Sequence, residues 1–307
     1  MREDEVDEGS LGIFAKNQTR WGERLRTEAG LRWDGFQFEV ESDDPRNSGK
    51  RRAGIFSPKA GLVLGPWSRT ELYANAGFGF HSNDARGTTI RIDPADGATP
   101  VERVTPLARS RGAELGLRTA AANGLVSTLS VWGLDLASEL VFVGDAGATE
   151  PAGRTRRYGV ELANFWRVNR WLTLDADVAL THARYREDAG GGREIANSIS
   201  RVVTGGVAFD RGEGWFAGAR LRYFGPQPLS EDGSVYALSS TTINARLGWR
   251  GKAWEVEFDV LNALDRDNHD IAYFYESRLA GEAASTEDVH FHPAEPRTLR
   301  VSVTRRW

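Results

Sequence analysis

Two features of the 307-residue sequence have the residue types and spacing of catalytic or phosphate-binding sites. Glu255 and Glu257 form a pair of carboxylates, the combination that glycosidases use as an acid and as a nucleophile or base. Residues 190–192 are three consecutive glycines, as in a loop that cradles phosphate. However, alternate carboxylates are a general property of a polar strand face, and no helix is expected after the glycines to complete a phosphate site. We therefore predict no catalytic residues and no cofactor.

A third feature is a group of potential metal ligands in the long, acidic segment 263–296. His290 and His292 stand close to Glu287 and Asp288, and imidazole and carboxylate groups both bind divalent metals. In a strand the two histidines share a face, but no third ligand has a fixed position. We predict no metal site here, and instead a solvated loop that contributes to ligand capture.

A fourth feature is a polar cluster where an apolar strand-like run ends near residue 81. His81, Asn83, Asp84 and Arg86 would project towards a ligand if this strand ends at the rim of a binding vestibule. The same residues also suit a turn held by a structural hydrogen-bond network, and both interpretations stay open. The complete set of candidate ligand contacts, in this rim and in the long external loops, is His81, Asn83, Asp84, Arg86, His269, Asp270, Tyr273, His290 and His292.

The elements that would position these residues are hidden by the overall composition. A net charge of −4 without a basic tract argues against nucleic acid as a partner. The lack of cysteine excludes disulfides and thiolate chemistry. No apolar stretch approaches the roughly 18 residues of a membrane-spanning helix, and the acidic start lacks the apolar core of a signal peptide. These totals alone are typical of a soluble protein, but they average over a strongly alternating pattern.

Alternation with a period of two is the main structural signal. In residues 253–262 acidic residues alternate with apolar ones, so the two sets lie on opposite faces of a strand. Similar runs of about ten residues recur along the chain, which is the length a tilted strand needs to cross a bilayer. Their apolar faces often end in aromatic residues, which fits an interfacial girdle better than the shared core of a β-sandwich. The predicted membrane-interface aromatics are Trp215, Tyr223, Trp249, Trp254 and Trp307.

The spacing of these runs predicts an all-β, antiparallel transmembrane barrel with about 13 strands. Short links with Gly or Asn turn residues alternate with long polar links, as periplasmic turns alternate with extracellular loops. The chain then begins in an external loop at residues 2–9. The short links are at 22–23, 65–67, 123–124, 169–170, 211–214 and 251–252, and the long links at 42–52, 83–109, 144–154, 187–197, 226–239 and 263–296. The predicted strands are 10–20, 24–41, 53–64, 69–82, 109–121, 125–143, 154–168, 171–186, 197–210, 214–225, 240–250, 253–262 and 297–307.

Several runs resemble the TonB-dependent outer-membrane receptors. They are Phe56-Ser-Pro-Lys-Ala-Gly61, the segment 72–87, the segment 132–143, Val260-Leu-Asn-Ala-Leu-Asp265 and the C-terminal segment 300–307, which ends in an aromatic residue. Barrels of this family have 22 strands around an N-terminal plug. By this resemblance residues 1–307 correspond to about the last 13 strands, as a C-terminal barrel segment without plug, TonB-binding box or signal peptide. Because a membrane barrel must close, we expect either a truncated product or fragment, or another chain that supplies the rest.

The resemblance implies a receptor and transporter, not an enzyme, in the outer membrane of a Gram-negative bacterium. It implies uptake of a scarce small-molecule ligand, such as a ferric siderophore, energised by the TonB complex through the N-terminal part. Other implied partners are the lipid bilayer and the outer-membrane assembly machinery, which would read the strand ending at Trp307. Two alternatives remain: a passive porin-like barrel, and a soluble β-rich binding protein.

Overall fold

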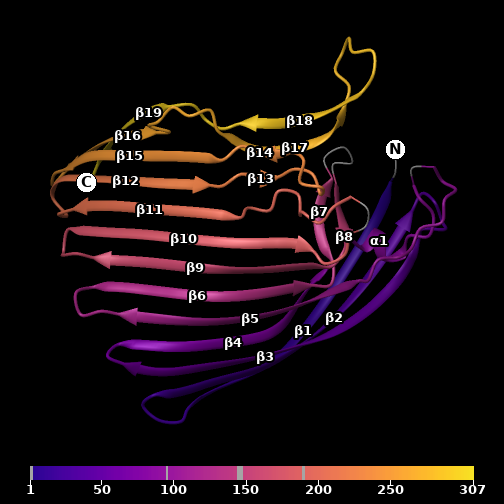
Figure 1. Ribbon diagram of the computed structural model, residues 1–307, viewed down its shortest axis with the longest axis horizontal. Helices are drawn as coiled ribbons and strands as arrows, with labels where there is room; N and C mark the ends of the chain where they lie inside the picture. Colours follow the sequence, from indigo (N-terminus) through magenta and orange to yellow (C-terminus); the bar gives the residue numbers. More distant parts are fainter. Residues whose placement is uncertain (1–2, 95, 144–147, 189–190) are drawn as a thin grey trace.

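A computed structural model describes residues 3–94, 96–143, 148–188 and 191–307, and its main feature is one antiparallel sheet of 13 strands (Figure 1). Each strand of this sheet pairs with the strands that precede and follow it along the chain within the sheet. In order, the strands are β1 (Asp4–Arg20), β2 (Leu25–Ser42), β3 (Gly49–Trp67), β4 (Thr70–Ser82), β5 (Leu107–Ala120), β6 (Leu125–Leu136), β9 (Thr155–Arg167), β10 (Leu172–Tyr185), β11 (Arg201–Asp210), β12 (Gly214–Phe224), β15 (Ser240–Arg250), β16 (Trp254–Leu261) and β19 (Thr298–Arg305). The predicted all-β fold class is confirmed.

Smaller elements lie in the long connections of this sheet. β7 (Glu139–Val143) pairs with β8 (Ala148–Ala152), and β13 (Gln227–Pro228) pairs with β14 (Tyr236–Ala237). β17 (His269–Ser277) and β18 (Thr286–Pro293) form a hairpin, and α1 (Ala85–Thr89) follows β4. Nowhere in the described ranges is there a helix with the length and hydropathy needed to cross a membrane.

Links between consecutive sheet strands alternate in length, as the sequence predicts. β1–β2, β3–β4, β5–β6, β9–β10, β11–β12 and β15–β16 are joined by short turns at one end of the sheet, here called the short-turn end. The other six connections lie at the opposite ends of the strands, here called the long-loop end. All the smaller elements belong to these connections (Figure 1). β1 and β19 stand at the two ends of the strand order, and among the described residues they do not pair with each other.

The register places residues of alternating character on two sides of the sheet, as β16 shows. Val256, Phe258 and Val260 of β16 face the same side as their partners on β15 and β19. Glu255, Glu257 and Asp259 face the other side, where β15 and β19 present arginines. We call the two sides of the sheet the apolar face and the polar face.

Three predicted boundaries were wrong at the N-terminal end of the sheet. The predicted external loop at 2–9 belongs to β1 from Asp4 onward, because the backbone of this acidic segment pairs with residues 37–42 of β2. The turn predicted at 65–67 lies instead at Ser68 and Arg69, which both adopt positive φ (48° and 68°) between the paired residues Trp67 and Thr70. Primed two-residue turns need such φ values, because their twist matches that of the flanking strands. Furthermore, β1 and β3 have 17 and 19 residues and extend beyond the predicted strands 10–20 and 53–64, whereas β2 agrees with the predicted strand 24–41.

Two further predictions were wrong in the long connections. The strand predicted at 125–143 is divided, because β6 ends at Leu136 and β7 pairs with β8 in a separate sheet. The segment 263–296, predicted as a solvated loop, contains the β17–β18 hairpin. Ala272 of this hairpin is buried against Leu229 and Ala237 of the β12–β15 connection. This apolar contact stabilises the folded hairpin.

A small apolar core closes the long-loop end of β1–β5. The ladder between β3 and β4 ends at the pair Lys59 and Gly77, although both strands continue. Beyond that point the strands are joined by side chains: Phe38, Val40 and Ile55 pack with Ala85 of α1 and Leu107 of β5. The rings of Phe36 and Phe80 meet edge to face, with centroids 5.8 Å apart. The guanidinium of Arg109 donates to the Phe56 carbonyl, 2.7 Å away, just beyond the end of the ladder.

Candidate functional site

The polar face carries carboxylates held between two cations. The most buried example is Asp259, whose side chain is 4% exposed. Its Oδ1 accepts from Nε of Arg246 at 3.1 Å, and its Oδ2 accepts from Nε of Arg300 at 3.2 Å. Glu257 lies 3.3 Å from the same Arg246. Because both guanidiniums remain about half exposed, the strands present a fixed charged wall rather than a closed core.

The same arrangement recurs on the polar face of the N-terminal strands β1–β5. Glu28 is bound by Lys16 at 2.9 Å and by Lys59 at 3.0 Å, from the two strands next to its own. Glu71 lies between Arg26 and Arg118, and Arg118 is 2.8 Å away. These contacts agree with the cross-strand ion pairs expected of alternating polar faces. A wall of this kind can bind polar surfaces by charge and hydrogen bonds.

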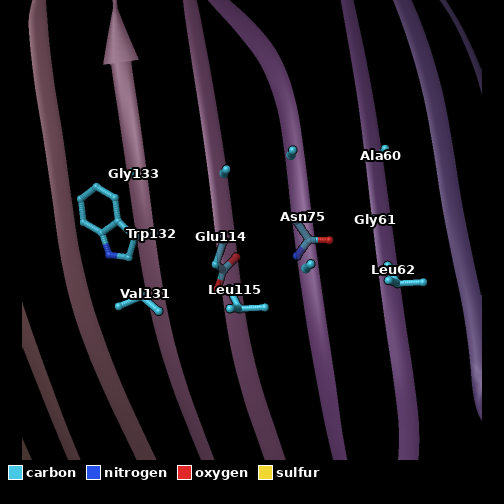
Figure 2. Close-up of a pocket in the computed structure, with 12 residues that line it drawn as sticks. Ala60, Gly61, Leu62, Asn75, Glu114, Leu115, Val131, Trp132 and Gly133 are labelled. Atoms are coloured by element: carbon cyan, nitrogen blue, oxygen red, sulfur yellow. The ribbon is translucent and has the colours of Figure 1, made fainter.

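The apolar face contains a hollow where β3–β6 carry small residues (Figure 2). The direct partners Ala60, Ala76, Ala113 and Gly133 form one row across these strands. The row below is larger, and Leu62, Leu115 and Val131 lie at one level of their strands in Figure 2. The hollow has a volume of about 640 Å³ and a mainly apolar lining.

The five predicted interface aromatics lie at the margins of the apolar face or at the chain end. Trp215 pairs with Trp249 beside the short-turn end, and Trp254 follows on β16. Tyr223 stands on the same face as Trp215 but eight residues further along β12, near its other end. At roughly 3.3 Å per residue this separation is about 26 Å along the strand, which at a tilt of roughly 40° spans about 20 Å of an apolar band about 25 Å tall. Trp307 is 98% exposed, and the guanidinium of Arg305 lies 4.0 Å from its ring centroid.

The predicted rim residues are brought together at the base of the connection 83–106. Asn83 is 3% exposed, and its side chain donates to the Thr105 carbonyl at 2.6 Å. Asp84 caps α1, accepting from the backbone N–H of Arg86 at 2.9 Å and from its guanidinium. His81 is half-buried on β4, and no hydrogen-bond partner of its Nε2 lies among the described residues. Three of the four residues thus make the contacts expected of a structural turn, while their role towards a ligand stays a prediction.

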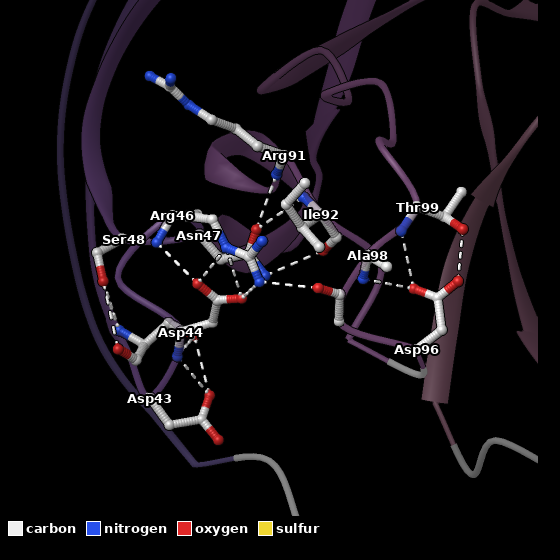
Figure 3. Close-up of polar contacts among 12 residues, drawn as sticks. Asp43, Asp44, Arg46, Asn47, Ser48, Arg91, Ile92, Asp96, Ala98 and Thr99 are labelled. Atoms are coloured by element: carbon white, nitrogen blue, oxygen red, sulfur yellow. Dashed lines mark hydrogen bonds and ion pairs between the residues drawn. The ribbon is translucent and has the colours of Figure 1, made fainter.

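A polar clamp fixes this connection to the β2–β3 turn (Figure 3). Asn47, only 1% exposed, accepts from the backbone N–H groups of Arg91 and Ile92 at 2.9 and 3.0 Å. Its side-chain N–H donates to the Ile92 carbonyl at 3.0 Å. Arg46 donates to the Gly97 carbonyl at 2.9 Å while its guanidinium binds Asp44. Hydrogen bonds from the Arg46 side chain and backbone hold the pKa of Asp44 at about 2, below the ordinary value of 3.8.

The second predicted ligand group lies on the β17–β18 hairpin. The ring of His290 stacks on the ring of Tyr275, with centroids 4.0 Å apart. In the β17–β18 ladder His290 is the direct partner of Tyr273. His269 stacks on Phe291 at 3.8 Å. His292 and Asp270 approach to 3.9 Å, and both side chains are 73% exposed. The hairpin therefore gathers imidazole, phenol and carboxylate groups, and no group of three or more potential metal ligands occurs in the part of the chain that the structure describes.

Sequence reasoning missed Asn47, the hollow and the hairpin. Only the turn residues around Asn47, Asp-Asp-Pro-Arg-Asn, gave a local signal, and that signal predicts a turn without naming its partner. The hollow depends on residues of four strands that share a level, which only the register reveals.

Comparison with known proteins gives one family match. The family model described as TonB dependent receptor-like, beta-barrel, matches residues 2–263.

Solved structures of transport receptors share this fold. The ferric-catecholate import receptor Fiu from K12 E. coli, in its closed form, superposes with a TM-score of 0.75 and 15% identity over 98% of the chain. The ferric yersiniabactin uptake receptor FyuA from Yersinia pestis gives 0.76, with 14% identity over 98% of the chain. The copper transporter OprC gives 0.73, with 17% identity over 97%. The chain covers 45%, 46% and 47% of these three structures, so it spans less than half of their length.

Proposed function

The chain belongs to the TonB dependent receptor-like β-barrel family, and from this premise we propose that it forms the C-terminal part of the wall of an outer-membrane transporter. The observation that carries the proposal is the two-faced sheet: 13 antiparallel strands with an apolar face, a charged face and all long connections at one edge. Hydrocarbon requires every backbone group of a spanning strand to be paired and one face to be apolar. A β-sandwich has no comparable reason to sort its connections by length.

In this proposal each surface has a separate task. The apolar face contacts the lipid of a Gram-negative outer membrane, with Trp215 and Tyr223 near its two boundaries. The polar face lines the lumen, where half-exposed arginines such as Arg246 and Arg300 bind a plug supplied by the rest of the protein. The long-loop end is extracellular and captures the ligand. The TonB complex acts through the N-terminal part, and the assembly machinery engages the strand that ends near Trp307.

We further propose that the ligand is a scarce metal complex of the ferric-siderophore type. Support comes from the similar solved structures, which include two receptors for ferric complexes and a copper transporter. The candidate contacts are the rim residues His81, Asn83, Asp84 and Arg86 and the hairpin residues His269, Asp270, Tyr273, His290 and His292. Stacked pairs such as Tyr275 with His290 offer flat surfaces and hydrogen-bonding edges to such a ligand.

Uptake by cells tests this function. Cells that produce the intact protein are expected to contain it in the outer-membrane fraction as a species whose gel mobility changes on heating. Accumulation of a radiolabelled ferric siderophore should depend on this protein and stop when TonB is deleted. Uptake that persists without TonB would favour a passive porin-like barrel. A monodisperse protein recovered without detergent would reject both transport functions.

A further inference from the structure

A cluster of charged side chains stands directly above the hollow in the apolar face, on the side of the long-loop end. It consists of Arg111 on β5, Asp135 on β6 and Arg156 on β9, which are direct partners across neighbouring strands. We call these three residues the arginine cluster. It interrupts a face whose lower rows are almost entirely apolar, and so its position needs an explanation.

The arginine cluster has more cationic groups than its one carboxylate can use. Asp135 is bound by Arg111 at 3.0 Å and by Arg156 at 2.8 Å. The carboxylate is 20% exposed, whereas the two arginine side chains remain 59% and 52% exposed. Each guanidinium has five N–H donors in a planar fork, and such forks bind phosphate in a bidentate manner. Two exposed cations around one anion leave a net positive charge and free donors that face outward.

The hollow begins one row below this cluster. Ala113 follows Arg111 by two residues, and Gly133 precedes Asp135 by two, so each pair shares a face of its strand. Two residues along a strand span roughly 7 Å, so the cluster and the hollow are close enough to contact one molecule. The hollow lies on strands that are paired on both sides, so its shape does not depend on β1 or β19.

We propose that the hollow and the arginine cluster together bind one phosphate-bearing lipid. One acyl chain occupies the hollow over Ala60, Ala76, Ala113 and Gly133, and the headgroup phosphate binds Arg111 and Arg156. The site rests on the proposed function, because it requires the apolar face to contact a membrane. Charge complementarity selects an anionic headgroup, and the apolar hollow selects a lipid over a soluble phosphate.

Native mass spectrometry of the intact protein in detergent tests the site. The probe is dioctanoyl phosphatidic acid, with dioctanoyl phosphatidylcholine as the headgroup control. The wild type should bind phosphatidic acid at least five times more tightly than phosphatidylcholine. The double variant Arg111→Gln/Arg156→Gln should lose at least fivefold in affinity for phosphatidic acid, and Ala113→Leu, which fills the hollow, should lose a similar factor.

Two matched variants keep the test specific. Lys50→Gln removes an exposed cation from the apolar side of β3, where Lys50 pairs with Glu39, and Ala217→Leu enlarges a residue of the same face on β12. Both should bind phosphatidic acid as the wild type does, and heat-modifiable mobility confirms that each variant is folded. Unchanged binding in the arginine double variant or in Ala113→Leu would overturn the site, as would equal binding of phosphatidylcholine. So would competition by glycerol 3-phosphate at the same concentration as the lipid. If the protein were instead soluble without detergent, the proposed function itself would fail.

Discussion

The phenyl ring of Phe216 lies over Gly248, its direct partner on the neighbouring strand, so closely that a Cβ atom on Gly248 would stand 2.1 Å from Phe216 Cζ. The ring is 6% exposed, and the guanidinium of Arg250 lies 4.7 Å from its centroid on the polar face. Tyr73 lies over Gly116 in the same manner. Glycine therefore lets aromatic rings lie flat against the polar face instead of projecting from it.

Gly248→Ala should destabilise the intact protein by about 1–3 kcal/mol, because the added methyl group overpacks the site and forces the Phe216 ring away from the sheet. Urea unfolding in detergent, followed by tryptophan fluorescence, measures the change. The control is Gly205→Ala, where the nearest atom to the new Cβ, the Asp175 carbonyl oxygen, is 3.6 Å away. Equal unfolding midpoints for Gly248→Ala and the wild type would contradict the packing described for Phe216.

Phe258→Arg should cost about 2–4 kcal/mol if the apolar face contacts the middle of a bilayer, because a charged group there loses its hydration. Phe258 is 41% exposed and lies between Val256 and Val260 on that face. The control is the next residue on the opposite face, Glu257→Gln, which should have a small effect. Unfolding of both variants in lipid vesicles gives the comparison. Similar losses for the two would show that the assignment of the faces to lipid and lumen is wrong.

Asn47→Ala should release the connection 83–106 from the β2–β3 turn. The change leaves two backbone N–H groups and one carbonyl without their partner, at a cost of about 1–3 kcal/mol when they stay buried. Hydrogen exchange at Arg91 and Ile92 should accelerate by about tenfold or more. Asn123→Ala serves as the control, because the Asn123 side chain lies in an exposed turn at the short-turn end and accepts a long, 3.4 Å hydrogen bond from the backbone N–H of Leu125. Unchanged exchange of the Arg91 and Ile92 amides in Asn47→Ala would show that Asn47 does not hold the connection to the β2–β3 turn.

Acid should open the same clamp within a defined pH range. The folded pKa of Asp44, about 2, lies below its ordinary value of 3.8, because the charged carboxylate accepts hydrogen bonds from Arg46. A lowered carboxylate pKa contributes stability that is complete above about pH 4 and is lost as the pH falls towards 2. Pepsin cleavage within residues 90–106 should therefore increase between pH 4 and pH 2. In Asp44→Asn the pH dependence should be weaker, and an identical profile in this variant would assign the transition to another group.

The alternating strands and most of their short turns could be predicted from the sequence, because the residues of a strand alternate between an apolar and a polar face. Alternation in residues 253–262 predicts both the strand β16 and its faces, and Gly-Lys at 251–252 predicts the turn before it. The turn at Ser68 and Arg69 could not be predicted in this way. Neither residue type favours positive φ, so the flanking ladder and not the local sequence determines the conformation.

The candidate site was less predictable, because it depends on contacts between distant segments. His81 and Arg86 could be placed at the end of a strand, but nothing local shows that Asn83 bonds to Thr105, 22 residues away. In the same way, the acidic composition of 263–296 predicts a solvated loop, while Ala272 finds its apolar partner in another connection. The hollow could not be predicted for the same reason, since Ala60 and Gly133 share one row only through the register of the two strands between them.

The end of the β3–β4 ladder at Lys59 and Gly77 has a consequence for how the rim resists force. Above this point β3 and β4 are joined by side chains and not by backbone-to-backbone hydrogen bonds: by Phe36, Phe80 and the core around α1, and by the Arg109 hydrogen bond to the Phe56 carbonyl. Apolar side-chain contacts are non-directional and tolerate small shifts between strands, whereas the backbone hydrogen bonds of a ladder are directional and do not. Any tilt of β1–β3 against β4 and β5 would therefore leave the paired part of the ladder intact, and it would be resisted by this core and by the contacts of Asn47 and Arg46 with Arg91, Ile92 and Gly97.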